Sequence, residues 1–193
     1  KWQDGKIKTA DGRVLTPSEL QTANESISTG VVDNQNNRDH YASPPGVTVI
    51  DKGIPLFEQS LIVDYKNLQN EHQGMTIQRF RDAQNFLSYG KLRYWIYLEK
   101  EKGNNIYIPK GEQEIVFRVG ADSLNYYEIR YPAEAISFDA DGSKMDKKRW
   151  KQIELDFSQL TSLKQNVHSA SESYEENVQI KVNNEPEQVI LKV

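Results

Sequence analysis

The segment from Gly90 to Tyr131 contains three stretches in which apolar and polar residues alternate, and this pattern restricts the fold more than any other feature. The apolar members are Leu92, Tyr94, Ile96 and Leu98 in the first stretch, Ile115, Phe117 and Val119 in the second, and Tyr127, Ile129 and Tyr131 in the third. A period of two among β-branched and aromatic residues indicates strands that bury one face. Consecutive strands with short connections pair antiparallel, so this segment predicts the centre of an antiparallel sheet.

Similar apolar stretches on both sides raise the expected total to about nine short strands, a number typical of a sandwich or jelly roll. They lie at 47–50, 58–66, 75–80, 150–157, 178–182 and 189–193. A short helical crossover is expected at 82–90, and Leu160 and Leu163 are expected in a turn that closes one end of the core. The sequence therefore predicts an all-β domain, an antiparallel β-sandwich or jelly roll of the galactose-binding-like type.

Residues 1–43 are polar and predict an extension with one short helix near 17–27. The run Thr16-Pro17-Ser18-Glu19 is typical of a helix start, with a threonine cap, proline in the first position and glutamate three residues after the cap. Asp33–Asp39 (DNQNNRD) is expected to be a loop. Pro44-Pro45-Gly46 then marks the start of a domain predicted to span 44–193.

Composition excludes several classes of function. The 193 residues carry a net charge of −4, which gives no reason to expect nucleic acid binding, since that usually needs a basic face. With no cysteine there are no disulfides, thiol nucleophiles or Cys-ligated metals. No window is apolar over the roughly 18 residues that a membrane helix needs, so no transmembrane segment is expected in this chain. Because the chain starts at Lys1 and ends at Val193 within an expected strand, it is expected to be a piece of a longer protein.

Candidate ligand-binding residues lie on the polar side of the alternating strands. Trp95 and Tyr97 point away from the apolar side and, with Arg93, predict an aromatic platform of the kind on which sugars stack. The alternative is that a second sheet, a loop or the N-terminal extension covers these rings. Tyr126 and Glu128 are also expected to face outward, with cross-strand packing against Arg118 or Arg130 as their alternative. These five residues, Arg93, Trp95, Tyr97, Tyr126 and Glu128, are the candidate ligand site.

A second candidate site is the run Asp139-x-Asp141-Gly142-x3-Asp146, which resembles part of a calcium loop. It lacks the glutamate at the twelfth position and is therefore not an EF-hand. Asp139, Asp141 and Asp146 are the candidate ligands for Ca²⁺, and a plain turn rich in aspartate is the alternative. No other cofactor is expected.

Catalysis has little support in the sequence. His40, His72 and His168 lie far apart in polar stretches, and no nucleophile-elbow, zinc-protease or phosphate-loop motif occurs. A glycan-active enzyme would need two carboxylates facing each other across a cleft, and no pattern in the sequence pairs them. The chain is expected not to be an enzyme.

The order of the strand motifs resembles that of the SprA family, large outer-membrane proteins of Bacteroidetes linked to gliding motility and type IX secretion. The resemblance covers about residues 41–164. The matching segments are Tyr41–Val47 (YASPPGV), Glu58–Leu61 (EQSL) with Tyr65–Leu68 (YKNL), Tyr89–Ile96 (YGKLRYWI), Phe117–Asp122 (FRVGAD) with Asn125–Glu128 (NYYE), and Ile153–Leu155 (IEL) leading to Leu160–Lys164 (LTSLK).

This resemblance implies a non-catalytic β-sandwich domain of a giant translocon, located at the cell surface, at the outer membrane or in the periplasm. It implies protein partners: the parent barrel, the secretion machinery or exported proteins. The alternative from the residues themselves is a carbohydrate-binding module. In that module Trp95, Tyr97 and Tyr126 would stack on a glycan, and Arg93 or Glu128 would bond its hydroxyl groups.

Overall fold

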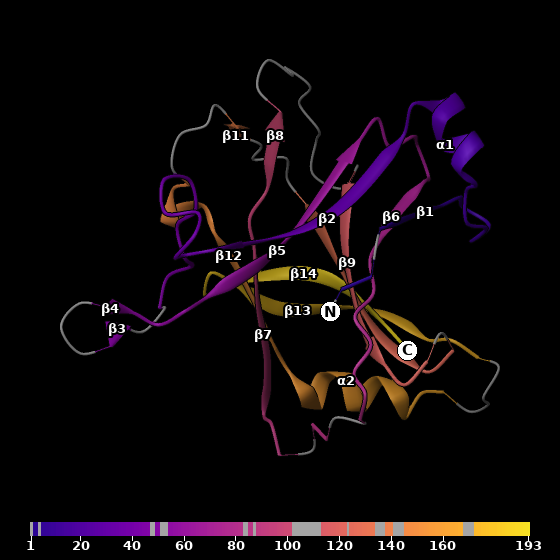
Figure 1. Ribbon diagram of the computed structural model, residues 1–193. Helices are drawn as coiled ribbons and strands as arrows, with labels where there is room; N and C mark the ends of the chain where they lie inside the picture. The colour runs from indigo at the N-terminus through magenta and orange to yellow at the C-terminus, as the bar shows by residue number, and fades with distance from the viewer. Residues whose placement is uncertain are drawn as a thin grey trace. The chain divides into compact units, whose positions relative to one another are not determined.

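The computed structural model is mostly β, with antiparallel sheets and, within the described residues, two short α-helices (Figure 1). It describes residues 2–3, 5–46, 49–50, 54–82, 85–86, 88–101, 113–122, 124–133, 138–140, 145–167 and 172–193, and only the backbone at 49–50, 54–55, 100–101 and 138–140. The chain divides into two compact units, Lys1–Asp82 and Ala83–Val193. The predicted antiparallel β class is confirmed. The sandwich layout and the boundary between residues 43 and 44 stay predictions.

The second unit is built on one six-stranded antiparallel sheet with the strand order β7-β12-β13-β14-β10-β9. Its strands are β7 (Lys91–Ile96), β9 (Gln113–Gly120), β10 (Tyr126–Ala133), β12 (Lys151–Asp156), β13 (Glu175–Val182) and β14 (Glu185–Lys192). Asn183 and Asn184 join β13 to β14 with φ angles of 51° and 68°. Asparagine tolerates this left-handed conformation, which a tight hairpin requires.

The sheet curls into a half-barrel, so that its first and last strands approach each other through the interior. Tyr94 on β7 stacks on Phe117 on β9, with ring centroids 4.7 Å apart and planes inclined by 19°. These strands are the two ends of the strand order, and a flat sheet would hold them about five strand spacings apart, roughly 24 Å. The curl therefore creates the enclosed volume that the apolar faces of the strands fill.

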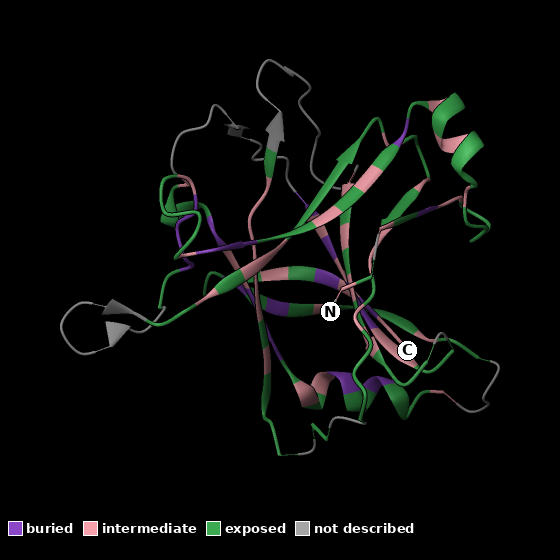
Figure 2. Ribbon diagram, in the orientation of Figure 1, coloured by how far each residue is buried: buried purple, intermediate pink, exposed green. Residues whose placement is uncertain are grey.

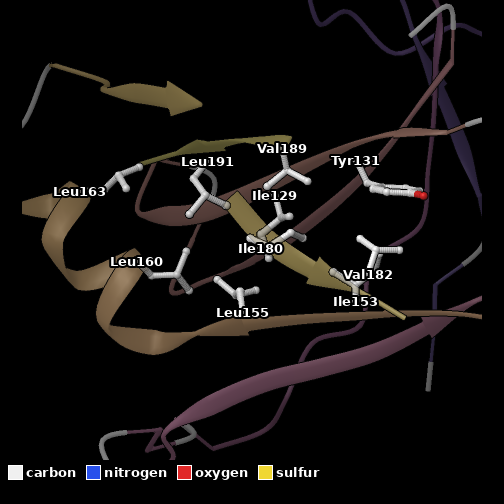
Figure 3. Packing of buried hydrophobic residues seen from close by; sticks show 10 residues of the cluster. All are labelled: Ile129, Tyr131, Ile153, Leu155, Leu160, Leu163, Ile180, Val182, Val189 and Leu191. Carbon is white, nitrogen blue, oxygen red and sulfur yellow. The ribbon is translucent and has the colours of Figure 1, made fainter. Parts of the chain in front are cut away.

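The core lies inside this curl and is closed at one end by α2 (Phe157–Lys164). Ten buried residues make up the cluster that Figure 3 shows: Ile129, Tyr131, Ile153, Leu155, Leu160, Leu163, Ile180, Val182, Val189 and Leu191. Leu160 and Leu163 do close the core as predicted, but they do so from a helix and not from a turn. The side chain of Gln159 accepts a 3.1 Å hydrogen bond from the Asp156 N–H, which stabilises the first turn of this short helix.

One polar atom in this interior lacks a partner, and its removal is a test of the packing. The Tyr94 hydroxyl is buried and makes no hydrogen bond in the described part of the chain. A buried hydroxyl without a partner carries a desolvation cost of about 1–3 kcal/mol. We expect Tyr94→Phe to leave the free energy of unfolding unchanged or to raise it by about 1 kcal/mol, measured by urea denaturation. Tyr127→Phe, at a half-buried position, is the control, and a clear loss of stability in Tyr94→Phe would contradict the assigned environment.

The first unit consists of α1 (Pro17–Ala23) and small antiparallel pairs of strands. The pairs are β1 (Lys6–Lys8) with β6 (Gln73–Met75), β2 (Ser26–Asp33) with β5 (Gln59–Lys66), and β3 (Val49–Ile50) with β4 (Ile54–Pro55). The loop predicted at 33–39 is a turn held by Asp33, whose carboxylate accepts the N–H groups of Gln35 and Asn36 at 2.8 and 2.6 Å.

Helix α1 begins as predicted but ends earlier. The N–H of Thr16 donates to the Glu19 carboxylate at 2.8 Å, and the Thr16 hydroxyl accepts from the Glu19 N–H, which completes a capping box. The prediction that the helix reaches residue 27 is wrong, because Asn24 adopts a left-handed conformation with φ 55° and terminates it. Ile27 lies in β2 instead.

Two other sequence predictions differ from the structure. The strand expected at 75–80 is β6 at Gln73–Met75. The described residues between 82 and 90 contain no helix, which fits the low helix propensity of Asn85, Ser88 and Gly90. The short strands β8 (Glu99–Glu101) and β11 (Phe138–Ala140) form a parallel pair that the sequence pattern did not indicate.

Candidate binding surface of the six-stranded sheet

The predicted ligand residues lie on the outer face of the six-stranded sheet, meaning the face opposite its core. On β7, Leu92, Tyr94 and Ile96 pack against the core, so Arg93 and Trp95 between them project outward. On β10, Ile129 and Tyr131 are core residues. The residues that alternate with them along the strand project from the other face, and these are Tyr126, Glu128 and Arg130. Figure 2 shows the burial of each strand.

At the β7–β12 edge, a glutamate holds two cations. Glu154 lies opposite Arg93 in the strand register, and its carboxylate accepts Lys91 Nζ at 2.6 Å and Arg93 Nε. The Glu154 side chain is only 10% exposed, whereas the side chains of Lys91 and Arg93 are 42% and 57% exposed. Lys91 first and Arg93 second lower the pKa of Glu154 below its ordinary value, so the carboxylate is charged at neutral pH.

The aromatic residues next to this cluster fall into two groups. Tyr97 packs edge-on against buried Trp150, with ring centroids 5.1 Å apart, and its hydroxyl accepts the Asp146 N–H at 3.1 Å. The Tyr97 ring is thus covered by residues of the same chain, as the alternative interpretation anticipated. Trp95 is half-buried beside Gln152 in the register, and among the described residues it makes no ring contact or side-chain hydrogen bond.

At the opposite edge, Glu128 is fully buried and binds two arginines. Its carboxylate accepts Arg130 Nε at 2.5 Å and also Arg118 Nε, and the Arg118 guanidinium lies 4.7 Å above the Tyr126 ring. Burial alone raises the pKa of Glu128, but the hydrogen bonds from Arg130 and Arg118 outweigh it, so its pKa is lowered. The cross-strand packing considered for Tyr126 and Glu128 is therefore present.

The structure divides the five predicted residues between two places. Arg93, Trp95 and Tyr97 lie together at the β7 edge, while Tyr126 and Glu128 lie on β10, with β12, β13 and β14 between them in the strand order. Sequence reasoning missed Glu154, although it alternates with core residues and so belongs to the polar face of its strand. Only the β7–β12 register shows that it faces Arg93.

In the first unit, apolar residues predominate on one face of the β2–β5 ribbon, although Ile62 on the other face is 44% exposed. Three register pairs form the apolar face: Ile27 with Tyr65, Thr29 with Val63, and Val31 with Leu61. Val31 is 55% exposed, Tyr65 41% and Val63 39%. Within the described residues, β2 and β5 pair only with each other, so each strand also has one unpaired edge. We call this surface the ribbon face.

Half-buried His72 and buried Glu25 form a pair that the sequence gave no reason to expect. His72 Nδ1 lies 2.9 and 3.0 Å from the two carboxylate oxygens of Glu25, which also accept the Gln69 N–H at 2.6 Å. Glu25 is 4% exposed. These contacts join the start of β2 to the turn that precedes β6. The pair of His72 and Glu25 therefore has a structural role.

The calcium prediction lies largely outside the described residues. Asp141 is not described, and Asp139 lies in β11 with only its backbone described. Asp146 caps the short 3-10 helix at Lys147–Arg149, and its carboxylate accepts the Lys148 N–H at 2.9 Å. Within the described residues, no group of three or more histidine, aspartate or glutamate side chains is arranged to hold a metal ion. Calcium binding therefore stays a prediction.

A search of the described helices for a membrane span found none with the length and hydrophobicity required. Comparisons of the chain with protein-family models, curated proteins and solved structures found no match.

Proposed function

We propose that this chain is a non-catalytic jelly-roll domain of a SprA-like protein of the cell surface or outer membrane, which serves protein secretion and gliding motility through protein–protein contacts. The ordered motifs between residues 41 and 164 support the family. The ribbon face is the observation that carries the contact function.

The chemistry of the ribbon face fits a protein partner. A two-stranded ribbon is at best marginally stable by itself, and contiguous exposed apolar surface marks interaction sites. Val31, Val63 and Tyr65 would supply buried apolar area to a partner. The unpaired strand edges would supply backbone hydrogen bonds to an added strand.

A photo-crosslinking residue placed at Val63 tests this function in intact cells. Val63 lies on the ribbon face, and its exposed neighbour Asp64 points to the other face of the same strand. We expect a discrete cross-linked product from position 63, at least five times as abundant as from position 64, with a component of the secretion machinery or an exported protein identified by mass spectrometry. Equal products from the two positions, or none from either, would contradict the contact function.

A second candidate function is carbohydrate binding, which one observation favours. Trp95 and Arg93 project from the same face of β7, and within the described residues the indole makes no ring contact and the outer edge of the guanidinium makes no hydrogen bond. The platform is smaller than the sequence predicted, because Tyr97 packs on Trp150 and Tyr126 lies under Arg118.

A further inference from the structure

We infer that Arg93 and Trp95 form a subsite for an acidic sugar, a pyranose whose carboxylate or sulfate group binds Arg93 while the ring stacks on Trp95. This inference rests on the second candidate function and names the class of glycan. Of the two arginine-containing clusters described on the outer face, the one at the β7–β12 edge combines a guanidinium edge without a hydrogen bond and a half-buried indole without a ring contact.

Glu154 fixes the orientation of Arg93. A guanidinium is planar and carries five N–H donors in a rigid fork. Glu154 binds Arg93 through Nε, and no described residue bonds Nη1 or Nη2. With the arginine side chain 57% exposed, this edge remains available to a planar oxyanion, which an arginine can bind through two parallel hydrogen bonds.

The local charge around Arg93 also favours an anion. Lys91 and Arg93 share the single carboxylate of Glu154, and Lys181 on β13 lies opposite Glu154 in the register. Lys181 is exposed and has no ion-pair partner in the described chain. Among the described residues, Asp156, opposite Lys91, is the other carboxylate on this part of the face. These three cations and two carboxylates leave one positive charge, which favours an anion although the whole chain has a net charge of −4.

The spacing of Arg93 and Trp95 suits a single sugar ring. Arg93 and Trp95 are two residues apart on one strand face, a separation of about 6.6 Å between their Cα atoms. A sugar ring stacked on the indole therefore carries its acidic substituent within reach of the guanidinium. Gln152, opposite Trp95 in the register, offers an amide for a ring hydroxyl. Aromatic stacking, an oxyanion fork and an amide together select an acidic sugar over a free inorganic anion.

The other arginine cluster lacks this combination and supplies a control. Arg118 also binds a glutamate through Nε, but it covers the Tyr126 ring at 4.7 Å, so that ring face is already occupied. The side chain of Arg118 is 44% exposed, which is close to the exposure of Arg93. Arg118→Ala therefore removes the same charge from the same face of the sheet without touching the proposed subsite.

Isothermal titration of the full chain with two pairs of glycans tests the inference. Oligogalacturonate is compared with its neutral methyl ester, and dextran sulfate is compared with neutral dextran. We expect a charged glycan to bind at least tenfold more tightly than its neutral counterpart, and the two pairs show whether carboxylate or sulfate is preferred. Arg93→Ala and Trp95→Ala should weaken binding at least tenfold, and Arg118→Ala less than twofold. Arg93→Lys keeps the charge but loses the fork, and should weaken binding at least fivefold. Thermal melting confirms that each variant is folded.

Four results would overturn the inference. Equal weakening by Arg93→Ala and Arg118→Ala, or unchanged binding by Arg93→Lys, would indicate unspecific attraction of a polyanion. Equal affinity for charged and neutral glycans would leave carbohydrate binding in place but remove the acidic subsite. No binding of any of the four glycans would overturn both the subsite and the carbohydrate-binding function, while the cross-linking result at Val63 would still decide the contact function.

Discussion

Replacement of Leu191 by alanine is expected to lower the free energy of unfolding of the second unit by about 3 kcal/mol, within the range of roughly 2–5 kcal/mol found for buried leucines. Leu191 is 0% exposed and lies on β14, opposite Ile129 of β10 and near the leucines of α2 in the core cluster. Truncation leaves a cavity that strands paired on both sides cannot collapse to fill. Urea denaturation followed by circular dichroism measures the loss.

The same substitution at Leu124 is the control for Leu191→Ala. Leu124 lies in the turn between β9 and β10 and is 87% exposed. We expect Leu124→Ala to change the free energy of unfolding by less than about 0.5 kcal/mol. Similar losses in the two variants would show that Leu191 is not part of a packed core.

Replacement of Glu128 by alanine is expected to destabilise the second unit by about 2–3 kcal/mol. Removing one partner of a buried ion pair typically costs about 3–5 kcal/mol. The expected cost is smaller here because the side chains of Arg118 and Arg130 are 44% and 29% exposed. Water can therefore replace part of the hydrogen bonding that the two guanidinium groups lose with the carboxylate. Glu114→Ala, at an exposed position on β9, is the control and should cost less than about 0.5 kcal/mol.

The Glu128 variant should also change how stability depends on pH. Because the pKa of Glu128 is lowered in the folded chain, its ion pairs contribute fully above the pKa of a glutamate in the unfolded chain, about 4.3. That contribution is lost as the pH falls through the lower pKa of the folded state. The difference in free energy of unfolding between wild type and Glu128→Ala should therefore be larger at pH 7 than at pH 3. An equal difference at both values would contradict a charged Glu128.

The sequence predicted the strands of the six-stranded sheet well because each one depends on local alternation. The apolar positions of β7, β9 and β10 face the core as expected, with Leu92, Tyr94 and Ile96 on β7 as the clearest case. The start of α1 was also predictable, since the capping box at Thr16 and Glu19 is a contact between residues close in sequence. The end of α1 was not, because the apolar residue at 27 fits both a helix stripe and β2.

The arrangement of the strands was beyond the sequence pattern. Strand β12 pairs with β7 across more than fifty intervening residues, and alternation is the same for any partner. Alternation alone could assign Arg93 and Trp95 to an outward face. Because the partner of β7 was unknown, Glu154, which anchors Arg93, could not be placed opposite it. The splitting of the five ligand candidates between two sheet edges has the same cause.

The central claim, that this chain belongs to a SprA-like protein of the cell surface or outer membrane, is tested most directly by immunoblotting fractionated cells with an antibody raised against it. We predict a band far larger than the 22.2 kDa of this chain, in the outer-membrane fraction. A band near 22 kDa in the soluble or secreted fraction would contradict the claim and leave carbohydrate binding as the leading function.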